Sequence, residues 1–415
     1  MSPVRPKVTL IGRRLEPEDH RIRDFLTRSA QAHDWVDAGS PEADRLLGHR
    51  AVQLPVLIDG DELLEGVTIE RLLDAWNYSA PPRRAHYDLA IVGAGPAGLA
   101  AAVYAASDGL TTIVLERDLP GGQASHTSMI ENFFGFPEGI GGAELARLAG
   151  RQAERFGAEV MVRRGVPGGR SAGDHVELEL DGGLAITATI MLAAPGMEWR
   201  RLDAPGIDAL LGRGVYYGAG RSEAAHCGGD AVVVVGAGNS AGQAVLNLAN
   251  AGAEVTMLVR GDRLGKTMSA YLVDRIEAHP LVEIRFRSHL VAAHGEGQLE
   301  AVTIAGPSGE ERRPARAAFI CIGGTPHTDW CAAAGVLTDP AGYILTGPDL
   351  LVEGRRPAGW PLDRDPLALE TSTPGLYAAG DARHGSTKRV AGAVGEGAMA
   401  VALAFRRLAE LGIAA

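Results

Sequence analysis

A strand–turn–helix–strand pattern across residues 87–116 restricts the possible folds of this chain more than any other feature. The segment reads YDLAIVGAGPAGLAAAVYAASDGLTTIVLE. An apolar run at residues 89–92 leads into a glycine turn, a helical stretch follows, and a second apolar run ends in an acid. Gly93 permits a tight turn, Gly95 lets the backbone approach a pyrophosphate, and Gly98 allows the helix to pack closely on the strand.

The residues around this turn predict a dinucleotide site. Pro96 and Ala97 open the helix, whose free N–H groups and dipole favour a pyrophosphate at its N-terminus. Glu116, followed by Arg117, ends the second strand, where a carboxylate can accept hydrogen bonds from a ribose. A glycine-rich structural turn is the alternative, but the preceding strand and the following acid favour dinucleotide binding.

A second fingerprint lies at residues 230–244, DAVVVVGAGNSAGQA. Its turn has the form G-x-G-x-x-A, with Gly236, Gly238 and Ala241 at the fixed positions and Asn239 and Ser240 between them. Two fingerprints in one chain predict two dinucleotides, one held as a flavin and one exchanged as a nicotinamide.

The residue after the next predicted strand, 254–259, indicates which nicotinamide is bound. An NAD-specific site usually offers an acid there, but this chain has Arg260, with Arg263 and Lys266 nearby. Because a guanidinium pairs bidentately with a phosphate, we expect NADPH, with NADH as the alternative.

Composition excludes several classes of protein. The chain has 415 residues, 55 glycines and a formal charge of −11. The excess of acids argues against nucleic-acid binding. No signal peptide or long apolar span is evident, so we expect a cytoplasmic protein without membrane segments. The three cysteines, Cys227, Cys321 and Cys331, form no metal-ligand or disulfide pattern. We assign no metal ligand and no catalytic side chain.

The first 80 residues form a separate predicted unit. Its expected elements are a strand at 8–11, a helix at 19–32, a short strand near Trp35, a strand at 56–59 and a helix at 68–76. This order resembles the thioredoxin/glutaredoxin fold, with Leu54-Pro55-Val56 at that family's cis-proline. No cysteine lies between the first strand and helix, so we interpret the unit as vestigial or docking. An unrelated α/β cap is the alternative. A polar linker follows at 79–84.

The segments after the first fingerprint resemble the low-molecular-weight thioredoxin reductase family over about residues 87–411. They are Gly121-Gly122-Gln123 and the ENFFGF stretch from Glu131. The resemblance implies FAD, with Gln123, Thr127 and Asn132 near its isoalloxazine or ribityl chain. Capping of a helix that starts at Gly142 is the alternative for each of these polar residues. Strands around 176–180 and 185–191 lead to 193–196, which resembles the turn where the family's chain leaves its FAD domain.

The resemblance continues near the C-terminus. Residues 319–323 with Pro326 resemble the family's re-entry strand, and a Pro- and Arg-rich loop spans 352–366. Gly380 and Asp381 match the GD motif whose aspartate binds the ribityl group, although Asp381 could instead cap the final helix. The segment Lys388-Arg389-Val390 matches a family segment whose backbone lies against the flavin pyrimidine. The alternative is that Lys388 and Arg389 are a pair of solvated basic side chains. In the second fingerprint region, the family has two adjacent arginines after the strand. This chain has only the first of them, Arg260, because Gly261 occupies the second position.

The family's redox dithiol is missing. The corresponding segment reads GVYYGAGRSEAAHCGGD, with Gly218 and Arg221 where the family has its two cysteines. Cys227 follows several residues later without a neighbouring cysteine. We interpret it as a packing residue, and a redox thiol is the alternative. A dithiol relay needs a second thiol, so we expect another electron acceptor.

These observations predict an α/β protein with two Rossmann-like dinucleotide-binding domains, for FAD and NAD(P)H, plus an N-terminal thioredoxin-like α/β domain. The predicted domains are 1–80 (thioredoxin-like), 85–200 with 318–415 (FAD) and 201–317 (NAD(P)H). The resemblance implies a homodimeric NAD(P)H oxidoreductase in which hydride passes to FAD. Its acceptor would be a protein electron carrier, a quinone or a small oxidant. The alternatives are a thioredoxin-disulfide reductase using partner cysteines or Cys227, and a slow redox sensor.

Overall fold

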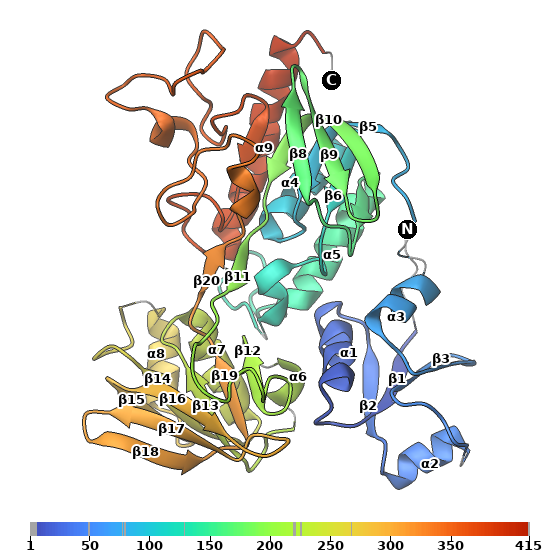
Figure 1. Cartoon of the computed structure of the whole chain (residues 1–415), viewed down its shortest axis with the longest axis vertical. Coiled ribbons are helices and arrows are strands. Elements are labelled where there is room, and N and C mark those ends of the chain that lie inside the picture. The colour runs from blue at the N-terminus through green and yellow to red at the C-terminus, as the bar shows by residue number, and fades with distance from the viewer. Residues whose placement is uncertain are drawn as a thin grey trace.

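The computed structural model shows three α/β regions, one at the N-terminus and two that each contain a glycine fingerprint (Figure 1). It describes residues 6–48, 50–76, 78, 80–127, 129–218, 221–224, 226–266 and 268–413. Within this part of the chain, no helix combines the length and the apolar character needed to cross a membrane.

The N-terminal region is a four-stranded sheet in the order β2-β1-β3-β4, flanked by three helices. The Leu54–Pro55 peptide bond is cis, as predicted. The first helix ends at Arg28, so the prediction of a helix to Ala32 was wrong. The sequence analysis missed α2 and β4, while Ser79 of the predicted linker lies outside the described residues. The elements are β1 (Val8–Gly12), α1 (Pro17–Arg28), β2 (His33–Asp37), α2 (Pro41–Leu47), β3 (Val56–Asp59), β4 (Glu62–Glu65) and α3 (Ile69–Ala75).

The first dinucleotide fingerprint lies in a seven-stranded sheet with the path β7-β6-β5-β10-β9-β8 and β21 paired to β10. Its parallel part consists of β7, β6, β5, β10 and β21. The antiparallel strands β8 to β10 form the predicted meander. The elements are β5 (His86–Val92), α4 (Pro96–Ser107), β6 (Thr112–Leu115), η1 (Gly122–His126), α5 (Gly142–Arg155), β7 (Glu159–Met161), β8 (Gly168–Ala172), β9 (His175–Leu180), β10 (Leu184–Ala193), β21 (Leu376–Ala378) and α9 (Val390–Glu410).

The second fingerprint lies in a five-stranded parallel sheet ordered β12-β19-β13-β14-β15, beside a three-stranded sheet of β16 to β18. The expected re-entry strand is β19 and pairs with β12 and β13, so its assignment to the first sheet was wrong. The elements are β12 (Val215–Tyr217), α6 (Arg221–Ala224), β13 (Ala231–Val235), α7 (Asn239–Asn250), β14 (Glu254–Val259), α8 (Ala270–Glu277), β15 (Val282–Phe286), β16 (His289–His294), β17 (Ala301–Gly306), β18 (Gly309–Pro314) and β19 (Ala317–Ile320).

A two-stranded ribbon joins the two fingerprint regions. It consists of β11 (Met197–Trp199) and β20 (Gly324–Pro326), which are antiparallel. Beyond it lie two short helices, η2 (Asp329–Cys331) and η3 (Gly347–Leu350), and then a long loop before β21.

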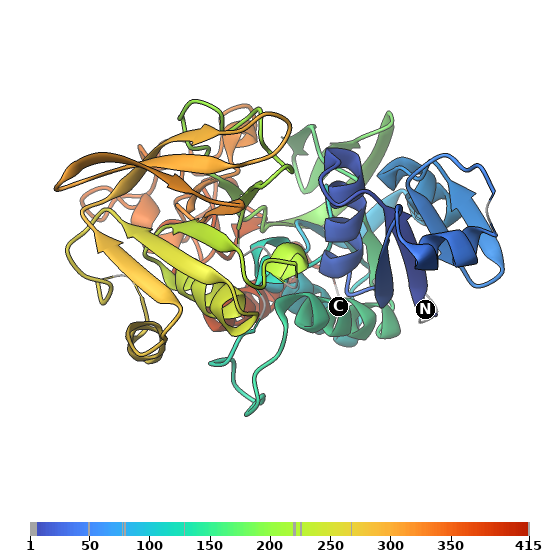
Figure 2. The ribbon, with the colours of Figure 1, turned by 90° about the horizontal axis from the view of Figure 1, so that it is seen from below.

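Helix α1 forms a second connection, because it contacts both fingerprint regions. Figure 2 shows α1, in dark blue, between the N-terminal sheet and the rest of the molecule. Arg28 donates to Asp118 in the first region at 2.6 Å. Arg23 donates to Glu223 on α6 at 2.5 Å, and both side chains are 2% exposed. The N-terminal region is therefore packed into the body of the protein.

Candidate functional site

A cavity of about 740 Å³ collects most of the predicted site residues from four separate parts of the chain. Its size lies within the range of known small-molecule and cofactor sites. The predicted residues that line it are Gly95, Pro96, Ala97, Glu116, Arg117, Gly122, Gln123, Thr127, Asn132, Asn239, Ser240, Gly380, Asp381, Lys388, Arg389 and Val390. The predicted residues outside its lining are Gly93, Gly98, Gly236, Gly238, Ala241, Arg260 and Arg263.

The first glycine turn divides its residues between packing and the cavity. Gly93 has a φ of +105°, and a Cβ there would lie 2.2 Å from the carbonyl oxygen of Ala194. A Cβ on Gly98 would lie 1.9 Å from the oxygen of Gly93. A Cβ on Gly95 would meet nothing within 4 Å. Gly93 and Gly98 are thus required by the protein's own packing, whereas Gly95 leaves space for a ligand beside the N-terminus of α4.

Glu116 has a role that sequence analysis missed. Its two carboxylate oxygens accept from the backbone N–H groups of Ala94, at 2.7 Å, and Asp118, at 2.8 Å. Burial raises the pKa of this carboxyl group, and the two hydrogen bonds oppose that effect. Glu116 therefore connects the end of β6 to the glycine turn, while it still lines the cavity.

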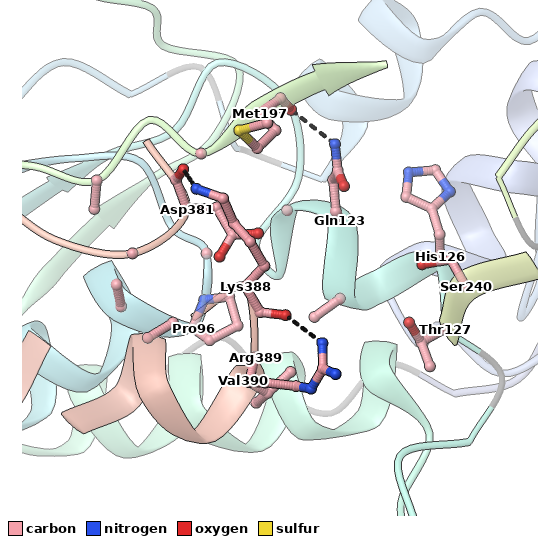
Figure 3. A pocket seen from close by; sticks show the side chains of 18 of the residues that line it. Pro96, Gln123, His126, Thr127, Met197, Ser240, Asp381, Lys388, Arg389 and Val390 are labelled. Carbon is pink, nitrogen blue, oxygen red and sulfur yellow. Dashed lines mark hydrogen bonds between the residues drawn. The ribbon is translucent and has the colours of Figure 1, made fainter. Parts of the chain in front are cut away.

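Asp381 and Lys388 form one cluster at the cavity wall (Figure 3). The Lys388 ammonium donates to the backbone carbonyl of Asp381 and lies 4.2 Å from the ring centre of Tyr343. Burial raises the pKa of Asp381 and lowers that of Lys388. Lys388 is therefore not a solvated base, although Arg389 is exposed. Asp381 is not a helix cap either, because α9 begins after Arg389.

The polar residues after the first fingerprint do not cap α5 with their side chains. The helix has Gly141 as its N-cap residue and no side-chain cap. Gln123 instead donates to the Met197 carbonyl at 3.0 Å, and the Thr127 backbone carbonyl accepts from Gly142. The capping alternative was therefore wrong, and the side chains of Gln123 and Thr127 lie at the cavity (Figure 3).

The second fingerprint repeats the geometry of the first. A Cβ on Gly236 would lie 2.2 Å from the Cys321 carbonyl oxygen, whereas Gly238 has open space around it. The Asn239 side chain bonds to Ser269 before α8, at 2.8 and 3.1 Å, and is not free for a ligand. Ser240 lines the same cavity as the first fingerprint. The two fingerprints therefore face one shared space.

The basic residues after β14 lie outside the cavity. Arg260, Arg263 and Lys266 are all exposed. Within the described part of the chain, no ion pair involves any of the three.

No thiol stands at the position of the expected dithiol. Gly218 is buried with a φ of +90°, and a Cβ there would lie 3.2 Å from the Trp199 indole. The side chain of Arg221 is not among those described. All three cysteines are free and buried, and burial raises their pKa values, to about 11 for Cys227 and about 12 for Cys321 and Cys331.

The cavity is also lined by residues that the sequence analysis did not find, among them Arg28, His126, Trp199 and Tyr217. His126 stands beside Thr127 in a segment already singled out, so its position in the sequence could have indicated it. Arg28 comes from the N-terminal region and Trp199 from the connecting ribbon. No local pattern marks either of them.

The fold and the cavity together define a dinucleotide-dependent redox protein. Residues 87–397 match the pyridine nucleotide-disulphide oxidoreductase family, and the chain belongs to it. It is 33% identical over 321 residues to a thioredoxin reductase of Treponema pallidum, covering 76% of this chain and 94% of the relative. The protein is a FAD-dependent, thioredoxin reductase-like oxidoreductase.

Two further similarities cover different parts of the chain. The crystal structure of Lactococcus lactis thioredoxin reductase superposes with a TM-score of 0.69 at 28% identity, covering 78% of this chain and 99% of that one. An alkyl hydroperoxide reductase component of Pseudomonas putida is 29% identical over 397 residues, which is 91% of this chain and 70% of the relative. The second similarity therefore extends into the N-terminal region.

Proposed function

We propose that this protein oxidises NADPH, or NADH, with FAD in the shared cavity, and passes the electrons to an acceptor other than an internal dithiol. The observation that carries the proposal is the shared cavity itself. It brings Gly95, Glu116 and Asp381 together with Ser240 of the second fingerprint. When bound, FAD would supply hydride and single-electron chemistry that amino-acid side chains lack.

The residues of the cavity fit FAD. The N-termini of α4 and α9 line it, neither has a side-chain cap, and their free N–H groups suit the pyrophosphate and the electron-rich pyrimidine edge. We assign the pyrophosphate to Gly95, Pro96 and Ala97, with Gly93 and Gly98 shaping the turn. Glu116 and Arg117 are assigned to the adenosine ribose. The flavin end is assigned to Gly122, Gln123, Thr127, Asn132, Gly380, Asp381, Lys388, Arg389 and Val390.

The nicotinamide dinucleotide is assigned to the second fingerprint. Gly236, Gly238 and Ala241 form its turn, and Asn239 and Ser240 lie where α7 begins. Arg260 and Arg263 are exposed and without ion pairs in the described residues, so they can receive a 2′-phosphate. NADPH is accordingly the preferred donor.

An acceptor other than a thiol pair is supported by the chemistry of the cysteines. A thiolate is the reactive form of cysteine, and burial disfavours it at all three positions. Two of the relatives named above are thioredoxin reductases, and reduction of a protein disulfide by this chain would need cysteines from the partner. We expect Cys227→Ser to leave flavin reduction unchanged.

We also propose a division into domains and a role for the first of them. The predicted domains are 1–80, 85–200 with 318–415, and 201–317. Because β19 (Ala317–Ile320) pairs with β12 and β13, we move the boundary after 317 to follow Ile320. The strand order of the N-terminal sheet and the cis-proline support a thioredoxin-like unit. Its contacts through Arg23 and Arg28 support a docking role.

A homodimer is proposed from an apolar groove between α4 and α5. The groove encloses about 610 Å³. Tyr104, Leu148 and Phe156 line it and are 50%, 40% and 45% exposed. Apolar surfaces of this kind mark contacts between proteins. Sedimentation velocity should show a dimer that Leu148→Glu dissociates, and a dimer unaffected by this change would place the interface elsewhere.

The function is tested by replacing Gly95 with valine. A Cβ there meets no protein atom within 4 Å, and Gly95 lines the cavity, so the variant should fold and purify with little flavin. The wild-type protein should be yellow and bleach rapidly with NADPH in an anaerobic stopped-flow experiment. Full flavin occupancy in Gly95→Val would contradict the assigned site, and a wild-type flavin that NADPH does not reduce would contradict the function.

A further inference from the structure

One end of the shared cavity has aromatic walls. His126 from η1, Trp199 from β11 and Tyr217 from β12 all line it. The rings of His126 and Trp199 meet edge to face, with centres 5.6 Å apart. Figure 3 places His126 near Thr127 and Ser240, away from Asp381 and Lys388. This end therefore lies where the flavin and nicotinamide regions meet.

Two polar groups at this end have no hydrogen-bond partner among the residues that the structure describes. Among the described residues, neither the ring nitrogens of His126 nor the Trp199 indole N–H form a hydrogen bond. Both side chains are half-buried, and a molecule that covered them would have to supply a partner, because fully buried polar groups are normally hydrogen-bonded. Burial and the charge of Arg28 lower the pKa of His126 to about 4, so its ring is neutral at pH 7 and carries one N–H. The cavity thus offers two hydrogen-bond donors beside an aromatic face.

Access of a protein disulfide to this end of the cavity is restricted. A Cβ on Gly218 would already lie 3.2 Å from the Trp199 indole, so there is little spare room beside this ring. Helix α6 is covered by α1, through the Arg23–Glu223 pair and through His20, which bonds to Glu223 at 2.9 Å. A protein approaching α6 would have to separate this buried ion pair. A small molecule that enters through the cavity would not.

We propose that this aromatic end binds a small planar carbonyl compound of the quinone class as the electron acceptor. Its ring would pack on the face of the Trp199 indole, and its oxygen would accept from the N–H of His126. The inference rests on the proposed function, which supplies the reductant. NAD(P)H loses two electrons and one proton, water supplies a second proton, and the quinone becomes a hydroquinone.

The test measures binding of 1,4-naphthoquinone to the purified holoenzyme by calorimetry, without NAD(P)H. His126→Phe keeps an aromatic ring but removes the N–H, and it should raise Kd about fivefold. Trp199→Leu removes the aromatic face and should raise Kd at least about tenfold, whereas Trp199→Phe keeps an aromatic face and should change Kd much less. Trp360→Leu is the control, because this indole bonds to the Arg364 carbonyl in a loop outside the cavity lining, and Kd should not change.

A second measurement, flavin reduction by NADPH in stopped flow, separates the possible failures. Weaker quinone binding with unchanged flavin reduction supports the proposal. A flavin that is reduced normally while naphthoquinone fails to bind, or binds all variants equally, overturns it and leaves the proposed function intact. Variants that slow flavin reduction as much as they weaken quinone binding would assign His126 and Trp199 to the nicotinamide and also overturn it. A wild-type flavin that NADPH cannot reduce would instead refute the proposed function.

Discussion

The two glycine fingerprints form the same turn but differ in how much of their surroundings the protein itself completes. In each, the first glycine packs against a carbonyl oxygen, at 2.2 Å from the position of a Cβ, and the second glycine faces open space. After β6, however, Glu116 is buried and bonded to the turn. After β14, Arg260 is exposed and has no ion pair in the described part of the chain. The first site is therefore organised by its own carboxylate, whereas the second is left open to an exchanging ligand.

Helix α1 shows the reverse contrast between the two regions. Its Arg23–Glu223 ion pair with the second region is buried, and His20 also bonds to Glu223. Arg28 and Asp118, which pair α1 with the first region, are 14% and 43% exposed. Buried ion pairs lose far more than exposed ones when one partner is removed. The N-terminal region should accordingly depend on Glu223 much more than on Asp118.

The largest effect is expected from Glu223→Gln. The change leaves the Arg23 charge buried without a counter-ion and should lower the free energy of unfolding by about 3–5 kcal/mol. Asp118→Asn, the matched change, should cost below about 1 kcal/mol. Urea unfolding monitored by circular dichroism gives both values. Equal losses would remove the distinction between the two contacts. A double variant, Arg23→Met with Glu223→Leu, should recover much of the stability.

The same ion pair predicts a pH dependence. Arg23 and His20 hold the pKa of Glu223 at about 2 despite burial, below its ordinary value of 4.5. Because the pKa of Glu223 is lower in the folded than in the unfolded state, its ionisation stabilises the protein at pH values above the unfolded-state pKa. This contribution is lost as the pH falls through the folded-state pKa. The stability difference between the wild type and Glu223→Gln should therefore shrink from pH 4.5 towards pH 2. A difference that stays constant over this range would show that the carboxylate charge is unimportant.

Arg260→Ala tests the open second site. Loss of a charged contact of roughly 1.5–3 kcal/mol should weaken NADPH binding about ten- to a hundredfold. NADH has no 2′-phosphate, so its affinity should change little. Arg312→Ala, another exposed arginine, should affect neither dinucleotide. Equal weakening of NADPH and NADH in Arg260→Ala would contradict the preference for NADPH.

The third position of the fingerprints gives the smallest expected effects. Gly98→Ala would place a Cβ 1.9 Å from the Gly93 oxygen and should cost about 1–3 kcal/mol, with loss of flavin. In the second fingerprint this position already holds an alanine, and Ala241→Gly should cost about 1 kcal/mol through helix propensity alone. Thermal unfolding of the Gly98→Ala and Ala241→Gly variants, with flavin release followed in the same experiment, measures both effects. Tolerance of Gly98→Ala would show that the first turn can relax.

The sequence alone predicted the local parts of this protein. Both strand–turn–helix units were found because their glycines and apolar runs are adjacent in the chain. The cis-proline was expected from the resemblance of the N-terminal region to the thioredoxin/glutaredoxin fold. Helix α1 was extended too far since no strong stop signal follows Arg28. Strand β4 was missed. Strand β19 was placed in the wrong sheet, because pairing partners are not encoded in a strand's own residues.

Only the tertiary structure placed residues from distant parts of the chain beside one another. Arg28, His126, Trp199 and Tyr217 come to one cavity from four separate elements, and Arg23 meets Glu223 across 200 positions. A polar residue on a helix has the same local pattern whether it faces water or a buried partner. Turn chemistry depends on neighbouring residues and can be predicted from them. The aromatic end of the cavity is formed by elements that are distant in the sequence. Its composition therefore depends on how the sheets and helices pack, and only the tertiary structure determines it.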